Sequence, residues 1–456
     1  MRNLCAVFYL LFLAQAESQE GLKNTDYIYL DNIRTVMLQP EQTVGVVSST
    51  RGVLKSNSSI SYNAGQVDSL KQRNQVNDIP VIALSGGKVI LSFDDMDGDY
   101  KYFRYRLVHC NADWTTSTLS ELEYLQGYND DRLPNGSPSF GVAALYTNYK
   151  MELPTATTRW TKSGNYLLHI YIDDGDKTPV LTRRFCIYES QYPITARFSR
   201  TGLTEKTDTH HELDFSVNCK NLNIRNSQRE IKVTVVQNSD WNSAKYNLLP
   251  NFTMSGVLTF DYQDSIVFPA GQEFRPFDTR SLLSNRIGVR SVESFKDAYD
   301  VTLYEDRPRI NEPYRFYYDI NGGFVINNFD IPDIDDPDTR SEYANVLFTL
   351  RAKQEYEGYD VYVVSKLTDW QAYSPFKMTY NEKQKSYFLD VEMKQGYYNY
   401  TYALFPKTGN GRPIFIDTNW FETEDNYTIL VYFRPVGDRY DRLIGYGTFN
   451  SLVDRG

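Results

Sequence analysis

Residues 165–189 carry the pattern that most constrains the fold, NYLLHIYIDDGDKTPVLTRRFCIYE. Apolar and polar side chains alternate along both halves, and Asp174-Gly175 stands between them, which is typical of two antiparallel strands joined by a tight turn. Short runs rich in aromatic and β-branched residues recur along the chain, and such residues favour pleated, half-buried surfaces. Helical patterns are confined to two short segments, near Leu119–Leu125 and Asp338–Asn345. The sequence therefore predicts an all-β protein.

Turn signals divide the strand-like runs into three groups. The chain has 456 residues, which suggests three domains at roughly 150 residues each. Regular strand spacing with turns between the strands is typical of sandwiches. We therefore predict tandem immunoglobulin-like or early-set β-sandwiches, with the boundaries 17–190, 191–307 and 308–456.

Residues 1–16 are predicted to be a signal peptide and not part of the fold. Arg2 gives a short positive start, Leu4–Ala14 is apolar, and Ala14-Gln15-Ala16 fits the small-x-small rule for cleavage. The apolar stretch is too short to span a bilayer as a helix, which needs about 20 residues. We expect an exported mature chain with no direct insertion into a membrane.

The balance of charge excludes one class of partner. The formal net charge is −10, whereas binding to nucleic acid phosphates needs a clustered basic surface. The same negative charge disfavours direct adsorption to anionic lipid. We therefore expect no nucleic-acid partner, and association with a membrane only through another protein.

The cysteines do not indicate a disulfide scaffold. Beyond the predicted signal peptide the chain has Cys110, Cys186 and Cys219, an odd number. Cys110 and Cys186 stand in apolar strand patterns, where a buried free thiol is the common outcome. One disulfide between any pair stays open as the less favoured alternative.

The sequence has no catalytic signature. It contains no Gly-x-Ser-x-Gly elbow, no His-Glu-x-x-His helix and no phosphate-binding loop, and only four histidines. The acidic run Asp94–Asp99 fails the spacing of a calcium-binding EF-hand, because Tyr100 would stand where the invariant glycine is required. A solvated turn is the preferred interpretation. We predict no catalytic, cofactor-binding or metal-binding residues, no cofactor and no enzymatic activity.

Aromatic residues on predicted loops are the candidates for contacts with a protein partner. Interface centres favour Tyr and Trp because these side chains bury a large area for few lost rotamers. Each candidate is equally compatible with a place in a core. The candidates are Trp114, Tyr124, Tyr128, Trp160, Trp241 and Trp420.

The third unit contains a strand, Val361–Val364, that leads to Asp369-Trp370, and the segment Gly396–Tyr402 follows it. This pattern resembles the early-set sandwiches that include glycogen-binding and starch-binding modules. The resemblance implies that Trp370 is a possible platform for stacking on a sugar ring. No second platform Trp is evident, so we favour packing of Trp370 within the sandwich.

Several longer blocks, spread in order over the first two units, resemble the type IX secretion system plug-domain family of Bacteroidetes. The blocks are SFDDMDGDYKYFRYRLVHCNADW (Ser92–Trp114), EYLQGYND (Glu123–Asp130), YTNYKMELP (Tyr146–Pro154), SGNYLLHIY (Ser163–Tyr171) and FPAGQEFRPFDTRS (Phe268–Ser281). With the early-set-like unit behind them, the resemblance covers nearly all of the mature chain.

The resemblance implies a non-enzymatic role in the periplasm. Members of this family close the periplasmic opening of the very large outer-membrane β-barrel through which the type IX translocon exports folded cargo. A barrel of that size encloses an aqueous pore, so an unoccupied channel would leak solutes. The expected partner is this barrel, with the chain a monomer within a hetero-complex that is peripheral to the outer membrane. The alternative is a glycan-binding periplasmic or surface protein that uses its C-terminal unit.

Overall fold

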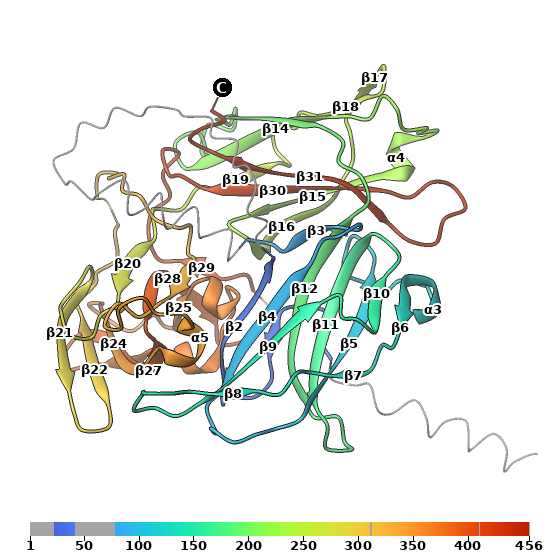
Figure 1. Ribbon diagram of the computed structural model, residues 1–456. Coiled ribbons are helices and arrows are strands. Elements are labelled where there is room, and N and C mark those ends of the chain that lie inside the picture. The colour runs from blue at the N-terminus through green and yellow to red at the C-terminus, as the bar shows by residue number, and fades with distance from the viewer. Residues whose placement is uncertain (1–21, 42–77, 311, 410, 456) are drawn as a thin grey trace, which may run out of the picture.

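The computed structural model describes residues 22–41, 78–310, 312–409 and 411–455. The predicted signal peptide and much of the polar segment before Val81 lie outside these ranges. Figure 1 shows three β-sandwiches: the first in blue to blue-green, the second at the top with green and red strands, and the third in yellow and orange. The all-β prediction is confirmed. No helix in the described ranges is long and apolar enough to cross a membrane.

The first sandwich packs a four-stranded sheet against one end of a ten-stranded sheet. The four-stranded sheet contains β2 (Ile33–Pro40), β4 (Val89–Asp95), β9 (Thr147–Leu153) and β8 (Ser137–Pro138), in that order. The ten-stranded sheet contributes β12 (Pro179–Tyr188), β11 (Gly164–Ile172), β5 (Phe103–Cys110) and β7 (Asp131–Arg132), and β1 (Tyr27–Ile28) and β3 (Val81–Ala83) also pair with β12. Side chains along β5 alternate between buried and half-buried, as the period of two requires. The hairpin predicted at 165–189 is confirmed, since β11 and β12 pair antiparallel.

The second sandwich is built from two separate parts of the chain. Its five-stranded sheet contains β13 (Ile194–Arg200), β14 (His210–Asn218), β18 (Val257–Phe260), β17 (Phe252–Met254) and β19 (Val267–Pro269). The facing layer is the other end of the ten-stranded sheet, with β16 (Asp240–Leu248), β15 (Ile231–Gln237), β30 (Asn426–Phe433) and β31 (Arg442–Asn450). The core between the two sheets includes Phe198, Phe215, Val233 and Val431.

The third sandwich occupies the stretch of chain between those two parts. One sheet contains β20 (Arg275–Asp278), β28 (Gly396–Pro406), β23 (Phe324–Ile326), β25 (Tyr359–Val364) and β29 (Ile414–Phe415). The other contains β21 (Val289–Ser294), β22 (Tyr299–Leu303), β24 (Tyr343–Arg351), β27 (Ser386–Lys394) and β26 (Thr379–Asn381). Phe277, Phe348 and Tyr398 are buried between these sheets.

Helical segments in the described ranges are single turns. They are α3 (Glu121–Tyr124), α4 (Ser227–Glu230), α5 (Pro337–Arg340) and the 3₁₀ turns η2 (Lys366–Thr368) and η3 (Ser374–Phe376). Directly after α3, the short strand β6 (Leu125–Gly127) pairs with β10 (Thr158–Trp160). The two predicted helical segments therefore contain only the short α3 and α5.

Strand pairing does not follow the predicted boundaries at 307/308 and at the C-terminus. Strands β20 to β22 were predicted to belong to the second unit, but β20 pairs with β28 and β22 pairs with β24 of the third. Strands β30 and β31 return to the second sandwich, where β30 pairs with β15 along seven residues on each side. The third sandwich is therefore an insertion within the second. The order of strands along the sequence did not predict which strands pair, because a strand pairs wherever its apolar face can be covered.

The ten-stranded sheet runs through the first and second sandwiches, which meet where Tyr188 of β12 lies beside Leu443 of β31.

Cys110 and Cys186, both buried and free, lie on strands β5 and β12, with Asn165 of β11 between them. Their Cα atoms are two strand spacings apart, about 9–10 Å, which is too far for a disulfide. Cys219 is also free and buried, so the prediction of buried thiols is confirmed.

Candidate partner-contact site

The predicted contact aromatics divide into buried and exposed side chains. Trp114, Tyr124 and Trp160 are buried. Of the two alternatives left open by the sequence, they take the place in a core and not the contact with a partner. Tyr128 is 69% exposed and stays a candidate for contact with a partner. The structure places Trp420 on a loop and half-buried, which leaves part of its ring accessible.

Trp114 is buried because it meets a residue of another sandwich. Its ring contacts Trp241 of β16 edge to face, with the ring centroids 5.0 Å apart. The guanidinium of Arg184 lies 5.0 Å from the first ring and 5.2 Å from the second, in the arrangement of a cation–π contact. Both tryptophans therefore help to join the first and second sandwiches. Sequence reasoning missed this because the loop of Trp114 is covered by a hairpin more than a hundred residues away.

Trp370 does not form an open platform. Its side chain is only 4% exposed, and its ring packs against Phe274, with 5.4 Å between the centroids. A Cβ on Gly322 would lie 2.3 Å from the indole, so the ring also lies directly on the backbone there. Stacking on a sugar needs a free ring face, and this geometry supports the packing role that the sequence favoured. The observation that motivated a glycan-binding third sandwich is thereby removed.

The acidic turn after β4 surrounds a lysine. Lys101 Nζ lies 2.6, 2.5 and 3.0 Å from carboxylate oxygens of Asp95, Asp97 and Asp99. Burial lowers the pKa of Lys101, but hydrogen bonds to the three carboxylates outweigh it and raise the pKa above its ordinary value. The ammonium therefore occupies the position in which a calcium ion would have to bind, as expected for a structural turn.

Asp94, the first residue of that acidic run, has a different role. It is buried and forms an ion pair of 2.6 Å with the buried Lys394 of β27. Tyr343 Oη donates to the same carboxylate at 2.7 Å, and Asn148 Nδ2 donates at 2.8 Å. Burial raises the pKa of Asp94, and Lys394 is the main influence that holds this rise back. The pair joins the first sandwich to the third without exposure to solvent.

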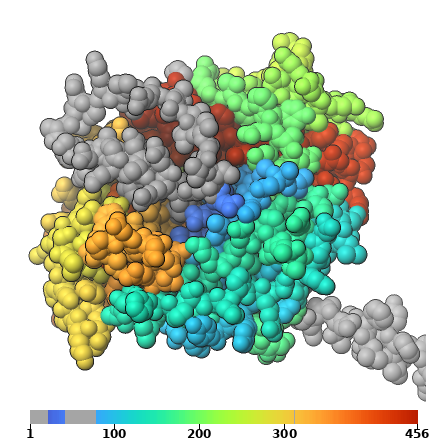
Figure 2. Space-filling view, viewed as in Figure 1, coloured from blue at the N-terminus to red at the C-terminus, as the bar shows by residue number. Residues whose placement is uncertain are grey.

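Further polar contacts close the same junction. The carboxylate of Glu342 accepts hydrogen bonds from the backbone N–H groups of Ala143 (2.5 Å) and Ala144 (3.0 Å), and Tyr146 Oη donates to the carbonyl of Ser341 at 2.8 Å. These contacts hold the β8–β9 loop against the third sandwich. In the space-filling view, Figure 2 shows atoms of the first sandwich in contact with yellow and orange atoms of the third.

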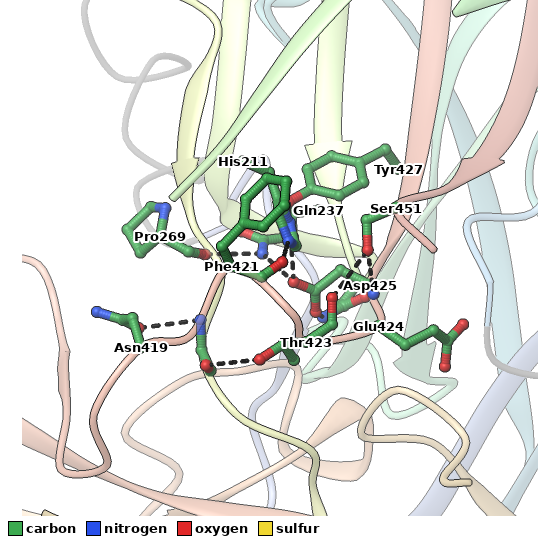
Figure 3. A network of polar contacts seen from close by, with 12 residues as sticks. His211, Gln237, Pro269, Asn419, Phe421, Thr423, Glu424, Asp425, Tyr427 and Ser451 are labelled. Carbon is green, nitrogen blue, oxygen red and sulfur yellow. Dashed lines mark hydrogen bonds and ion pairs between the residues drawn. The ribbon is translucent and has the colours of Figure 1, made fainter. Parts of the chain in front are cut away.

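A buried network fixes the chain where it returns from the third sandwich to the second (Figure 3). The carboxylate of Asp425 accepts hydrogen bonds from Gln237 Nε2 (3.0 Å) and Asn238 Nδ2 (2.6 Å). His211 Nδ1 lies 3.5 Å from the same carboxylate and 2.9 Å from Tyr427 Oη. Burial raises the pKa of Asp425 to about 8 and lowers that of His211 to about 4. Both groups therefore favour the neutral form at neutral pH, which suits a structural network.

The other strand histidines also have structural partners. His109 bonds Ser117 Oγ at 2.8 Å and the carbonyl of Ser163 at 3.0 Å, and burial lowers its pKa to about 4. His169 bonds Thr182 Oγ1 at 3.2 Å, and burial lowers its pKa in the same way. These contacts agree with the structural role predicted for both.

One other acidic group lies between the second and third sandwiches. Ligand oxygens of Glu273, Asp319 and Glu424 lie within 4.8 Å of one another, and all three residues are buried. Burial, and next the charge of Asp319, raise the pKa of Glu273 well above its ordinary value. A proton held by Glu273 therefore reduces the repulsion, and we assign no metal to this group.

Exposed apolar side chains gather on two loops at one end of the first sandwich. Tyr100 and Tyr102 lie on the β4–β5 loop, and Phe140 and Leu145 lie on the β8–β9 loop, with exposed fractions between 64 and 72%. The loops lie against each other, because a Cβ on Gly98 would be 3.6 Å from the Cβ of Leu145. We call these four residues the loop-end patch. Exposed apolar side chains on neighbouring loops are candidates for an interaction site, and carboxylates of the acidic turn precede Tyr100 in the chain.

The sequence contained a signal for the loop-end patch that was not used. Tyr100 and Tyr102 directly follow the acidic run, and residues 139–145 form an apolar stretch bounded by turn residues. The backbone of the β8–β9 loop bonds to the third sandwich, but the side chains of Phe140 and Leu145 stay 72% and 68% exposed.

Comparison with known proteins gives one family match. Residues 66–189 match the family described as type 9 secretion system plug protein, first domain. A crystal structure of a hypothetical protein from Parabacteroides merdae is similar over 94% of this chain and 100% of that chain, with 29% sequence identity and a TM-score of 0.81. A collagen adhesin from S. aureus is 7% identical, over 80% of this chain and 89% of its own, with a TM-score of 0.10 that supports no argument. No curated protein matches the sequence.

Proposed function

Because its first domain makes this chain a member of the type 9 (type IX) secretion system plug protein family, we propose that it closes the periplasmic opening of the outer-membrane β-barrel of that translocon. In this role the chain is a non-catalytic periplasmic subunit. It is a monomer within a hetero-complex and reaches the outer membrane only through its barrel partner. The family match is the observation that carries the proposal.

The construction of the molecule supports a closing role. A plug must resist deformation across its own width, and here each sandwich contacts the other two through side chains. A compact body of 456 residues has a radius of gyration of about 22 Å, so it is roughly 57 Å across. Such a body is wide enough to cover the mouth of a barrel that encloses an aqueous channel.

The loop-end patch is our candidate for the surface that meets the barrel. Its two tyrosines supply the aromatic area that interface centres favour, and the acidic turn beside them supplies a polar rim. Reversible binding requires a moderate area with such a rim, because cargo must be able to pass.

The first experiment is purification of the tagged protein from mildly solubilised envelopes of its own host, followed by mass spectrometry. The proposal predicts a very large barrel protein in near-stoichiometric amount. Deletion of the gene should raise the permeability of the outer membrane to large antibiotics more than it reduces secretion. Absence of a barrel partner, together with unchanged permeability, would contradict the proposal.

A pair of variants tests the loop-end patch. Replacing Tyr100, Tyr102 and Leu145 with Ser should reduce recovery of the barrel at least tenfold while the protein stays folded. The matched control replaces Phe252 and Met254 of β17, which are also exposed but lie on the second sandwich. Equal recovery with both variants would reject the patch but leave the plug role itself intact.

A further inference from the structure

A cleft opens between the second and third sandwiches and has no part in the proposed plug role. Its cavity volume is about 200 Å³, just below the usual range for small-molecule sites, so it has room for a small organic ligand only. Three segments line it: the β15–β16 hairpin, the crossover from β19 to β20, and the loop that contains β29. Asn242 Nδ2 donates to the carbonyl of Trp370 at 3.1 Å and holds two of its walls together.

The walls of the cleft are mainly apolar. Phe268 and Phe274 come from the crossover, and Phe415 comes from β29, so three rings face a common space. Trp370 also lines the cleft, and its buried indole N–H has no hydrogen-bond partner.

Two cationic side chains line the cleft, together with three aspartates. Lys245 and Arg412 line it, and in the described ranges neither makes an ion pair with a carboxylate. Burial lowers the pKa of Lys245, and the charges of Arg412 and Lys206 lower it further, so these cations lie near one another. A group of unpaired cations in a protein of net charge −10 favours an anion.

The carboxylates of the cleft already have partners of their own. Asp417 forms ion pairs with Arg275 (2.5 Å) and Arg309 (2.7 Å). Asp240 accepts hydrogen bonds from Asn242 N at 2.8 Å and Asn242 Nδ2 at 2.9 Å, and burial raises its pKa to about 7. Burial disfavours the charged forms of Asp240 and Asp425, although the charge of Arg412 opposes this at Asp240, so these acids compensate only part of the positive charge of Lys245 and Arg412.

We propose that this cleft binds an organic carboxylate with an apolar body, which lies against Phe268, Phe274 and Phe415 while its carboxylate pairs with Lys245 and Arg412. Two sources share this chemistry, a free alkyl carboxylate and the carboxyl terminus of a polypeptide with an apolar last residue. Hydrogen bonds between a cation and a carboxylate are charge-assisted, with Lys245 half-buried and Arg412 exposed at the rim, and the adjacent rings supply the apolar contact that small inorganic anions cannot use.

Isothermal titration calorimetry of the mature protein tests the proposal with defined probes. Decanoate represents the alkyl source, and the peptide Ala-Ala-Leu-Phe with a free carboxyl terminus represents the polypeptide source. Binding of either probe at least tenfold tighter than acetate supports the proposal, and the tighter of the two identifies the source. The peptide amide should bind at least tenfold more weakly than the acid.

Matched variants assign any binding to the cleft. The double variant Lys245→Gln/Arg412→Gln should weaken binding at least tenfold, and Phe415→Ala should weaken it without a change of charge. The control Lys353→Gln/Arg290→Gln removes two exposed cations of the third sandwich and should bind as the unchanged protein does.

Three outcomes would overturn the proposal. They are failure of both probes to bind, equal binding of decyltrimethylammonium, and equal weakening by the control variant. Binding of a neutral maltooligosaccharide in place of the carboxylates would also overturn it. Because these readouts use only the purified chain, they are independent of whether the barrel is its partner.

Discussion

Replacement of Lys394 by Met should reveal how strongly the first and third sandwiches are joined. The ammonium pairs with Asp94 at 2.6 Å, and both side chains are 1% exposed. Methionine fills a similar volume but leaves a carboxylate in a site without a cation. Because burial already raises the pKa of Asp94, loss of Lys394 should drive this carboxyl to the protonated form at neutral pH.

The expected cost follows from that protonation. An aspartate in the unfolded chain has a pKa of about 3.9, roughly three units below pH 7, and each unit corresponds to about 1.36 kcal/mol. Lys394→Met should therefore lower the free energy of unfolding by about 4 kcal/mol, which agrees with the loss seen when one partner of a buried pair is removed. Since the folded variant holds a proton that the unfolded chain releases, the deficit should shrink as the pH falls from 7 towards 4.

Urea denaturation at pH 7.0 and pH 4.5, followed by tryptophan fluorescence, measures both quantities. The control is Lys150→Met, which removes an ion pair with Asp338 at the same junction but from a lysine side chain that is 56% exposed. That loss should be at most about 1 kcal/mol. The double variant Asp94→Asn/Lys394→Met should regain most of the stability, because it removes both charges. A loss in Lys394→Met that is no greater than in the control, or that does not change with pH, would refute the reasoning.

Three further predictions concern other parts of the molecule. In urea denaturation, Gly322→Ala should destabilise the protein by several kcal/mol more than Gly358→Ala. Both glycines have positive φ, but only a Cβ at position 322 would clash, and it would clash with Trp370. Equal losses would contradict this packing. Asp425, whose pKa is raised to about 8 in the folded protein, should contribute stability that is lost as the pH rises from 4 to 8, because the unfolded chain releases this proton near pH 4. Asp425→Asn should therefore change the pH dependence of the free energy of unfolding, and an unaltered slope would contradict this prediction. The buried thiols should react with Ellman's reagent only after unfolding in guanidinium, because burial also raises their pKa, and rapid labelling of the native protein would contradict their placement. These thiols are Cys110, Cys186 and Cys219.

Individual strands could be predicted from the sequence where the alternation of side chains is strong. The hairpin at 165–189 and strand β28 have long apolar and aromatic patterns, and both lie where predicted. Strand β16 was missed because its sequence, DWNSAKYNL, is largely polar and half-buried. A period of two can be recognised only where one face of a strand is apolar and the other is not.

The assignment of strands to sandwiches, and of aromatics to the surface, depends on contacts between distant residues. Strand β30 has the same kind of sequence whether it pairs with β15 or with a strand of the third sandwich, so its place could not be predicted locally. The same holds for Trp114, which stands on a loop but is covered by Trp241. Exposure of a loop residue is decided by what folds over it.

The insertion of the third sandwich within the second has a mechanical consequence for the proposed role. A domain on one linker can turn about it, whereas an inserted domain is held by two crossings of the chain. Here the return crossing carries the network of Asp425, and the Asp94–Lys394 pair joins the inserted domain to the first sandwich. Opening between any two sandwiches would therefore break buried polar contacts. In the proposed role, cargo would displace this protein from the barrel as one rigid unit, so that release depends on the strength of its outer contacts and not on a change of its own fold.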